Sequence, residues 1–330
     1  MDAPAIRWGV LGPGGIARDW TAALHATTAS RVTAIGSRSL DRAQAFAADF
    51  GVERSHGSYA ELVADDGIDA VYVASPHSEH REHALLALAA GKPVLVEKAF
   101  TRNAAEAADV IDSARERGLL AVEAMWTRFL PHIDVVRRCL EDGVLGDIRA
   151  VEADHGQLLY PDGPRRLAAP ELAGGALLDL AIYPISFAYF VLGGFAAVQA
   201  TGTLTETGVD AGETVAVVGP RDAIGTLGST MLAKTPCAAS VSGTAGRLEI
   251  DGWFYQPNTV RLIDTDDREL DRYDSPSREH GLAYEAAEFA RLLTAGKSES
   301  DLLPLDETLR IMQILDDIRA QLGVAFPGEG

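Results

Sequence analysis

The chain has 330 residues, of which 47% are hydrophobic and 23% are charged. This length favours two domains, and the composition is typical of a soluble globular protein with substantial cores. The formal net charge of −19 argues against binding to nucleic acid or to anionic membranes, because both attract positively charged proteins.

The first part of the chain alternates between strands and helices. Strands are predicted at residues 6–11, 31–36, 70–74, 94–98 and 119–123. Helices are predicted from the glycine-rich turn to about residue 25, and at residues 40–50, 79–90 and 104–117. This alternation indicates a parallel, doubly wound sheet, so residues 1–123 are predicted to form one α/β domain.

The pattern changes after residue 124. A helix, a strand, a loop rich in proline, arginine and glycine, and an apolar helix are predicted at residues 132–141, 148–154, 161–175 and 176–192. Strands then follow one another without intervening helices, at residues 198–204, 214–218, 223–232, 238–242, 247–250 and 259–263. Two helices, at 282–295 and 305–322, complete a second α/β domain (124–330) with a largely antiparallel open sheet.

Residues 180–198 contain no charged side chain and approach the length needed to cross a bilayer. Pro184 and the Gly193-Gly194 pair interrupt this stretch, so we expect a buried helix that ends near Gly193. Residues 1–7 lack a basic region followed by an apolar core, so no signal peptide is expected. Only two cysteines are present and no Cys-x-x-Cys pattern occurs, which favours a reducing, cytoplasmic location.

The turn after the first strand carries a dinucleotide-binding pattern, Gly12-Pro13-Gly14-Gly15-Ile16-Ala17. Gly12 allows a tight turn, Gly14 lets a pyrophosphate approach the backbone, and a small residue at Ala17 lets the helix pack on the strand. The pattern is often accidental when it stands alone. Its place between a strand and a helix favours a Rossmann domain in which Gly12, Gly14, Gly15, Ile16 and Ala17 contact the cofactor.

The residues at the end of the second predicted strand indicate whether the domain prefers NAD or NADP. An acidic residue about 20 positions after the fingerprint would hold the ribose of NAD, but the sequence there is Ser37-Arg38-Ser39, with no carboxylate before Asp41. Two hydroxyls and a guanidinium suit a 2′-phosphate, so NADP is favoured over NAD. Arg42 is a second candidate phosphate contact, or an ordinary solvated charge. Alternatively, Ser39 only caps the next helix.

Three histidines, His77, His80 and His83, are spaced by three residues. No aspartate or cysteine with ligand spacing accompanies them, so no metal site is expected. We expect Ser75, His77 and His80 to contact the cofactor, because they follow a strand end that faces the nucleotide crevice. His83 is expected on the helix surface.

Lys98 is one of only four lysines and ends an apolar, strand-like run. Asp179 and Tyr183 lie four residues apart in an apolar helix and are expected to share one face. Oxidation of an alcohol requires a base, and a tyrosine can serve at neutral pH if a cation stabilises its phenolate. Lys98 could supply that cation, and Asp179 could orient the substrate. Alternatively, Lys98 only extends into solvent, Asp179 is an acidic residue that the helix dipole favours near a helix N-terminus, and Tyr183 belongs to the core.

The order of these motifs resembles the glucose-fructose oxidoreductase / inositol dehydrogenase / rhizopine-catabolism (Gfo/Idh/MocA) family over almost the whole chain. The resemblance rests on the glycine-rich turn, Glu97-Lys98, and the run Gly174-Gly175-Ala176-Leu177-Leu178-Asp179-Leu180-Ala181-Ile182-Tyr183-Pro184. Residues 97–101 and 123–129 resemble its dimeric dihydrodiol dehydrogenase branch, which includes NADP-dependent D-xylose dehydrogenases.

This resemblance implies hydride transfer on a sugar, polyol or diol, with a cofactor domain (1–123) and a substrate-binding, dimerising domain (124–330). It implies Lys98 and Tyr183 as the catalytic pair, Asp179 as an assisting residue, Glu97 and Lys98 as cofactor contacts, and a homodimer or higher homo-oligomer. Three positions depart from common members: Ala99 replaces a proline, Tyr183 a histidine and Ala181 a glycine.

Aromatic and basic residues are candidates for contact with a sugar ring or an apolar diol. Trp126, Arg128 and Phe129 follow the last strand of the first domain, Trp253 stands in a Trp-Phe-Tyr cluster, and Arg165 lies in the loop before the apolar helix. Core packing is the common alternative for such aromatics, and solvation for the arginine.

An NADP-dependent oxidoreductase is the function that the sequence favours. A catalytically silent, nucleotide-sensing regulator on the same fold, an NAD-dependent inositol-type dehydrogenase and a metal-dependent enzyme are the alternatives.

Overall fold

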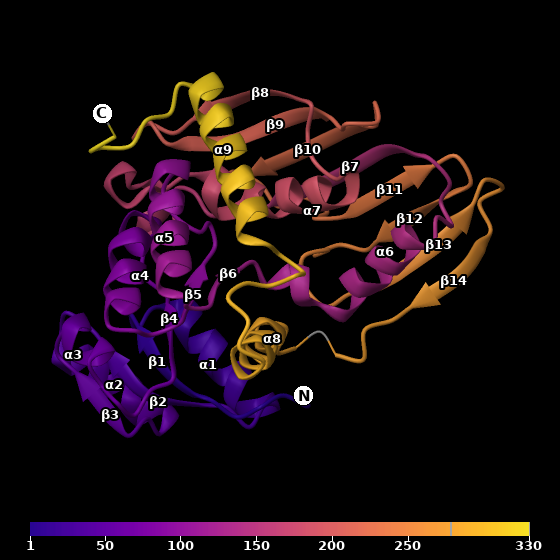
Figure 1. The fold of residues 1–330 in the computed structure, drawn as a ribbon. Helices are drawn as coiled ribbons and strands as arrows, with labels where there is room; N and C mark the ends of the chain where they lie inside the picture. The colour runs from indigo at the N-terminus through magenta and orange to yellow at the C-terminus, as the bar shows by residue number, and fades with distance from the viewer. Residues whose placement is uncertain (278, 330) are drawn as a thin grey trace. The chain divides into compact units, whose positions relative to one another are not determined.

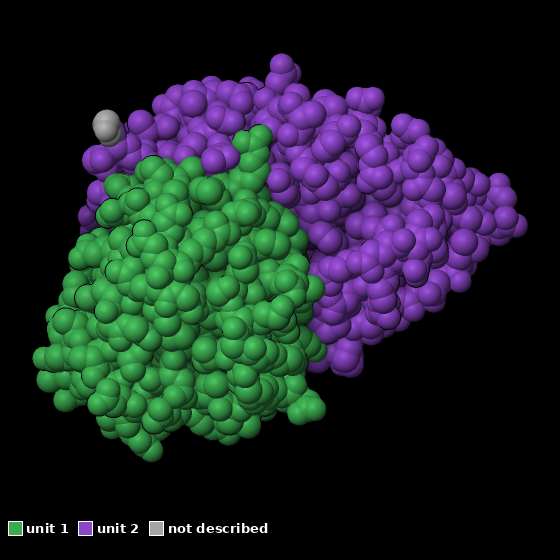
Figure 2. Space-filling model, in the orientation of Figure 1, with its two compact units in different colours: residues 1–129, 279–312 green, residues 130–278, 313–330 purple. Residues whose placement is uncertain are grey.

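A computed structural model of the chain describes residues 1–277 and 279–329. The chain forms two compact units: residues 1–129 with 279–312, and residues 130–278 with 313–330 (Figures 1 and 2). The division predicted from the sequence assigns residues 279–312 to the second domain, whereas their contacts place them in the first unit.

The first unit contains a six-stranded parallel sheet in the order β3-β2-β1-β4-β5-β6. Its strands are β1 (Arg7–Leu11), β2 (Arg31–Gly36), β3 (Arg54–His56), β4 (Ala70–Val73), β5 (Val94–Glu97) and β6 (Ala121–Ala124). Every residue of the last three is buried, as expected for strands covered on both faces. This strand order is that of a Rossmann domain.

The helices of the first unit fall into two groups of neighbours. α1 contacts α2 and α8, and α4 contacts α3 and α5. Their bounds are α1 (Gly15–Thr27), α2 (Leu40–Phe50), α3 (Tyr59–Val63), α4 (His80–Ala89), α5 (Ala104–Arg117) and α8 (Ala283–Thr294), with short 3-10 helices η1 (His77–Glu79) and η2 (Trp126–Phe129). The doubly wound arrangement predicted from the sequence is confirmed.

An aromatic core explains why α8 belongs to the first unit. The ring of Phe289, on α8, lies 4.8 Å from that of Trp8 on β1. Trp8 in turn meets Trp20 edge-on at 5.0 Å, and Trp20 stacks on Tyr72 at 4.2 Å. All four side chains are fully buried. Such large buried rings contribute much of the hydrophobic stabilisation of a domain.

The second unit contains an eight-stranded mixed sheet in the order β14-β13-β12-β11-β7-β10-β9-β8. All neighbouring strands are antiparallel except β7 and β10, so the prediction of a largely antiparallel sheet is confirmed. The strands are β7 (Ile148–Gly156), β8 (Ala197–Leu204), β9 (Asp210–Val218), β10 (Ile224–Thr230), β11 (Ala239–Gly243), β12 (Gly246–Ile250), β13 (Val260–Asp264) and β14 (Glu269–Tyr273).

Helix α7 (Ile182–Leu192) packs against β7 and β10 of this sheet. Helix α6 (Pro131–Glu141) contacts β13, and α9 (Leu305–Leu322) contains the boundary between the two units. The loop before α7 contains η3 (Arg165–Ala168) and η4 (Pro170–Leu172).

Among the described residues, one helical segment, Pro170–Leu192, is long and apolar enough to cross a membrane. Its most apolar window has a mean hydropathy of 1.7, and 89% of that window is buried inside the protein. The core helix of a globular protein has these same properties, so length and composition alone are weak evidence for a membrane span.

Two local differences from the sequence prediction affect the segment around Asp179. A π-helical turn, Leu177–Ala181, precedes α7, so the regular spacing that placed Asp179 and Tyr183 on one face does not continue through both residues. Strand β9 begins at Asp210, four residues before its predicted start. The first feature contains Asp179 and lies just before Tyr183, and the second places Asp210 against the start of the same segment.

Candidate active site

The glycine-rich turn of the first unit has the backbone that a pyrophosphate needs. Gly12 has a φ of +102°, and a Cβ there would lie 3.1 Å from the carbonyl oxygen of Ala74. Gly15 has open space around its Cα, and Ile16 is exposed, whereas Ala17 is fully buried. No side chain caps α1, and its first turn has no acidic residue, so its N–H groups suit an anion.

The strand end at Ser37 carries hydroxyls and a guanidinium. The Ser37 hydroxyl accepts a hydrogen bond from the backbone N–H of Ser39 at 3.2 Å. Arg38 is exposed, and its charge and hydrogen bond act on the phenol of Tyr59, whose pKa is raised by burial. Arg42 and Asp41 are exposed on the first turn of α2. The loop therefore offers Arg38 and Arg42 to an anionic ligand.

The three spaced histidines have different partners in the first unit. Nε2 of His77 lies 3.2 Å from the Lys98 carbonyl oxygen. His80 is fully buried, with Nε2 2.7 Å from the Ser75 carbonyl oxygen and Nδ1 3.0 Å from that of Ala99. Burial lowers the pKa of His80 to about 4, so the ring is neutral at pH 7 and its single N–H donates to only one of these two oxygens. His80 thus packs between the loop after β4 and the loop after β5.

The surface position predicted for His83 is wrong. Its side chain is buried, and Nδ1 lies 2.9 Å from the Ser75 hydroxyl. The Tyr59 ring meets the His83 ring edge-on at 4.4 Å. The sequence analysis did not predict α3, which brings Tyr59 against α4 and covers His83. The described residues hold no group of three or more metal-ligating side chains.

Lys98 directly follows β5 and is half-buried. Its backbone N–H donates to Oε2 of Glu97 at 3.2 Å, and the Tyr72 hydroxyl donates to the other oxygen of Glu97. The Lys98–Ala99 peptide bond is cis, as is Tyr160–Pro161. The carboxylate of Glu97 and the ring of His77 thus hold the backbone on either side of the Lys98 Cα.

Asp179 lies in the π-helical turn of the second unit and is 8% exposed. Its Oδ1 accepts a hydrogen bond from Nη2 of Arg166 at 2.9 Å. Arg166 belongs to η3, in the proline- and glycine-rich loop, and its side chain is 44% exposed. The loop therefore supplies the counter-ion of Asp179, a role that the sequence did not reveal.

Tyr183, in α7, belongs to an aromatic cluster of the second unit. Its ring lies 4.8 Å from that of Tyr255 and 5.1 Å from that of His155, and the His155 and Tyr255 rings stack at 4.0 Å. Tyr183 is 7% exposed. Burial first, and then the neighbouring thiol of Cys237, raises the pKa of Tyr255 above its usual range, so Tyr255 stays a neutral phenol.

His155 is oriented by two polar contacts within the same unit. Its Nδ1 lies 3.2 Å from the carbonyl oxygen of Leu180, in the π-helical turn. Its Nε2 lies 2.9 Å from the amide nitrogen of Gln157, a donor. An imidazole that donates from Nδ1 and accepts at Nε2 satisfies both contacts. His155 thereby links the end of β7 to the segment that carries Asp179.

The predicted substrate contacts differ in their surroundings. Arg128 is 3% exposed; it forms an ion pair with Glu307 at 2.5 Å and donates to the Leu302 carbonyl oxygen at 3.0 Å. Phe129 is buried and Trp126 is half-buried. In the second unit, Arg165 is exposed, and the Lys234 ammonium lies 5.4 Å from the ring of Trp253.

The sequence matches two family models. Residues 6–124 match the oxidoreductase family with an NAD-binding Rossmann fold, and residues 133–249 match the GFO/IDH/MocA C-terminal domain. The chain belongs to the Gfo/Idh/MocA oxidoreductase family. The predictions of the family, the fold class and a dehydrogenase or reductase are thus confirmed.

Relatives in this family match along the whole chain. Trans-1,2-dihydrobenzene-1,2-diol dehydrogenase of Homo sapiens is 35% identical over 332 residues, and that of Macaca fascicularis is 36% identical over 332 residues; both matches cover 98% of each chain. A 3-ketoreductase from Actinomadura kijaniata, solved with NADP and TDP-benzene, has a TM-score of 0.84 and 31% identity, covering 97% of this chain and 98% of that chain.

An aldose-aldose oxidoreductase from Caulobacter crescentus has a TM-score of 0.87, covers 96% of this chain and 97% of its own, and is 23% identical. At that identity the likeness establishes the fold alone. The likeness of fold therefore extends through both units.

Three residues near the Asp179–Tyr183 segment escaped the sequence analysis: His155, Gln157 and Asp210. Arg166 was considered with Arg165 in the loop for which contact with the substrate and solvation were the two alternatives, and only its pairing with Asp179 was missed. His155 and Gln157 stand at the end of a strand whose predicted limit was two residues too short, and Asp210 stood outside the predicted β9. Only tertiary contacts bring these residues to the Asp179–Tyr183 segment.

Proposed function

We propose that this protein is an NADP-dependent oxidoreductase that transfers a hydride between nicotinamide and a secondary alcohol or hemiacetal of a cyclic trans-diol, sugar or polyol. One observation carries the substrate class. Relatives named for a trans-diol of dihydrobenzene match 98% of the chain at 35–36% identity. We infer that this chain acts on the same class of CH–OH group.

The aromatic cluster supports a ring-shaped substrate. His155, Tyr183 and Tyr255 bring three rings together, and Trp253 lies 5.8 Å from Tyr255. Aromatic faces pack against the apolar faces of sugar rings and of unsaturated carbocycles. Among the predicted substrate contacts, Trp126, Arg165 and Trp253 are the stronger candidates, because their side chains are not fully buried. Phe129 and Arg128 are the weaker candidates, because their side chains are buried.

The proposed chemistry assigns one task to each polar side chain. The Tyr183 phenolate accepts the proton of the substrate hydroxyl, and the Lys98 ammonium stabilises the negative charge that this requires. Asp179, held by Arg166, accepts a hydrogen bond that orients the substrate. A nicotinamide held by the first unit would supply the hydride acceptor, and the alcohol would become a carbonyl while Tyr183 holds its hydroxyl proton.

The cofactor preference rests on the end of β2. The uncapped start of α1 fits the pyrophosphate, and Ser37, Arg38 and Arg42 fit a 2′-phosphate better than a ribose hydroxyl. We expect Arg38→Ala to raise the Kd for NADP at least about tenfold and to change the Kd for NAD much less, since one charge-assisted hydrogen bond is worth about 1.5–3 kcal/mol. Equal effects on both nucleotides in a fluorescence titration would contradict this preference.

The decisive experiment measures nicotinamide reduction over a panel of aldoses, polyols and cyclic trans-diols, with NADP and NAD in parallel. Turnover of at least one substrate with NADP supports the proposal. Tight NADP binding without turnover of any of them would favour the nucleotide-sensing regulator instead. Turnover that survives extensive chelation separates this mechanism from a metal-dependent one.

We further propose that residues 1–123 hold the cofactor and that residues 124–330 bind the substrate and form a cytoplasmic homodimer. Both described cysteines are free thiols, which suits a reducing compartment. Strands β8, β10 and β14 each expose a large apolar side chain, namely Leu204, Ile224 and Leu270, which suits a subunit interface. Light scattering of the purified protein tests the assembly.

A further inference from the structure

A buried carboxylate contacts the start of the segment that carries Asp179 and Tyr183. Asp210, the first residue of β9, is 1% exposed. Its Oδ2 accepts a hydrogen bond from the backbone N–H of Leu177 at 2.5 Å, and the amide of Ala176 also acts on it. The first N–H groups of a helical segment have no partner within it, so this carboxylate supplies one.

Two glycines make this close approach possible. Gly175 has a φ of +120°, and a Cβ there would lie 2.2 Å from Oδ1 of Asp210. A Cβ on Gly174 would lie 2.5 Å from the carbonyl oxygen of Arg166 and 2.6 Å from that of Leu167. The same two positions therefore admit Asp210 and the loop that brings Arg166 to Asp179.

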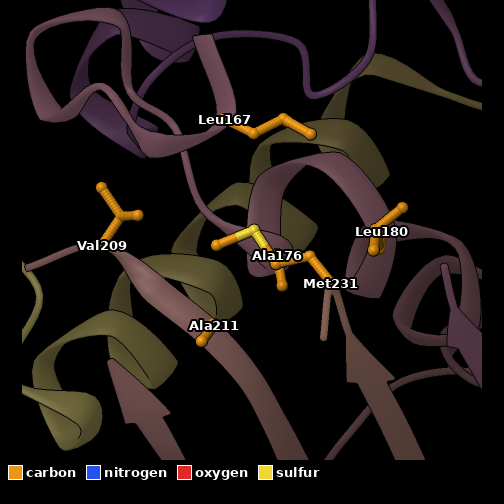
Figure 3. Packing of buried hydrophobic residues seen from close by; sticks show 6 residues of the cluster. All are labelled: Leu167, Ala176, Leu180, Val209, Ala211 and Met231. Atoms are coloured by element: carbon orange, nitrogen blue, oxygen red, sulfur yellow. The ribbon is translucent and has the colours of Figure 1, made fainter. Parts of the chain in front are cut away.

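Apolar packing fixes the position of Asp210 relative to the segment. Its neighbours Val209 and Ala211 belong to a buried cluster with Ala176 and Leu180 of the segment and Leu167 of the loop (Figure 3). Met231, after β10, completes the cluster. Because these side chains are 0–2% exposed, the carboxylate has little freedom to move away from the Leu177 amide.

Asp210 and Glu213 form a pair of buried carboxyl groups in which Asp210 is the ionised member. Burial raises the pKa of Asp210 to about 6, and the backbone amides and the charge of Arg319 oppose that rise. Burial, and then the charge of Asp210, raise the pKa of Glu213 well above its usual range. The Ser229 hydroxyl contacts Oε1 of Glu213 at 2.5 Å. Glu213 thus holds a proton, while Asp210 carries the negative charge toward the amides.

We propose that Asp210 is a positioning residue for the reaction: its carboxylate anchors the start of the π-helical turn and so fixes the placement of Asp179 and Tyr183. This inference rests on the proposed function, because it needs those two side chains to act on the substrate. A displacement of about 1 Å in a reacting group can cost about 100-fold in rate. The anchor acts through the backbone, so Asp210 itself need not touch the substrate.

The test compares Asp210→Asn with a matched variant, Asp154→Asn. Asp154, on β7, also accepts two backbone N–H groups, those of Cys237 and Ala238, at 2.9 and 3.1 Å. Both substitutions keep the shape of the side chain and remove its charge. Two quantities are measured in each folded variant: kcat with its pH dependence, and the hydrogen-exchange rates of the amides at residues 176–183.

In Asp210→Asn we expect kcat to fall at least about tenfold, the Kd for NADP to stay unchanged, and the amides at 176–183 to exchange faster. In the wild-type protein we expect kcat to fall as pH drops through about 6, where Asp210 takes up a proton, and this acid limb should be absent from Asp210→Asn. Asp154→Asn should keep kcat, the acid limb and the slow exchange at 176–183. A purely structural role would lower stability without changing the acid limb.

Either of two results overturns the inference: a kcat within twofold of wild type in an active enzyme, or unchanged exchange at 176–183. If the proposed function itself is wrong, the result differs from these two, because the wild-type protein then turns over no sugar or diol. In that case the exchange rates alone decide whether Asp210 anchors the segment.

Discussion

At the scale of single residues, Tyr183 and Asp179 are each held by neighbours from other elements. Rings of β7 and of the loop after β12 surround Tyr183, and a loop arginine pairs with Asp179. A side chain that must move a proton benefits from such a fixed orientation, because its placement is then settled before the substrate binds.

Replacing Tyr183 by phenylalanine removes the proposed base and keeps the ring. We expect kcat to fall at least about 100-fold, as for loss of a general base, while the thermal midpoint stays near that of wild type because the aromatic packing remains. Steady-state turnover and a melting curve measure the two effects. Unchanged turnover would reject Tyr183 as the base.

Replacing Arg166 by methionine tests whether the ion pair orients Asp179. We expect kcat to fall about tenfold from lost positioning, and stability to change by less than about 1 kcal/mol because Arg166 is half exposed. Arg149→Met is the control, since Arg149 forms an exposed ion pair with Asp147 in the same unit. Equal kcat values for the two variants would argue against a role for Arg166.

The sequence identifies the residues whose chemistry is unusual for their position, such as Lys98 after an apolar strand and Tyr183 in an apolar helix. It does not identify their partners. Arg166 and His155 reach the Asp179 segment through a loop and a strand end, and contacts of this kind depend on tertiary packing. The sequence analysis placed His83 on the surface for this reason too, because the contact of His83 with Tyr59 also depends on tertiary packing.

At the scale of elements, strong periodicity and clear turn residues predicted α2, α5 and α9 to the residue. The short elements β3 and α3 were missed, because three to five residues give too little pattern to recognise. The π-helical turn was also missed, since nothing in an apolar run distinguishes it from the α-helix that follows. The start of β9 was placed too late because its first residues, Asp210-Ala211-Gly212, lack β-branched side chains.

Gly175→Ala tests the fit between the helix start and β9. Alanine at a φ of +120° costs about 1–3 kcal/mol because L residues rarely adopt this conformation, and overlap with Asp210 adds about 1–3 kcal/mol. Gly193→Ala is the control, because Gly193 ends the same helix with a φ of +71° and has open space around its Cα. Denaturant unfolding should show the larger loss for Gly175→Ala; equal losses would mean that the overlap is relieved.

At the scale of the whole molecule, the buried carboxyl of Glu123 makes the free energy of unfolding depend on pH. Burial raises the pKa of Glu123 to about 7 from its usual 4.5, against a hydrogen bond from Thr308. The folded state then binds more protons than the unfolded state between these two pH values. The free energy of unfolding therefore falls as pH rises through this window, by about 3 kcal/mol for this group.

Glu123→Gln should remove that loss, so that the variant gains stability over wild type at pH 8 and gains little at pH 4. Asp65→Asn is the opposite control: burial raises the pKa of Asp65, but hydrogen bonds from Arg54 and His56 outweigh it and lower the pKa to about 2. Its substitution should cost stability at pH 7 and cost less as pH falls toward 2. Urea unfolding at several pH values measures both trends, and a pH-independent gain for Glu123→Gln would contradict this account.

The return of residues 279–312 to the first unit has a consequence for biosynthesis. Trp8, in the first strand to leave the ribosome, meets its partner Phe289 only after most of the chain has been made. We expect the nascent nucleotide-binding half to remain incomplete, with an indole surface open to chaperones, while the entire second sheet is being translated. A gene truncated after codon 129 should accordingly yield an aggregation-prone fragment rather than a miniature Rossmann protein.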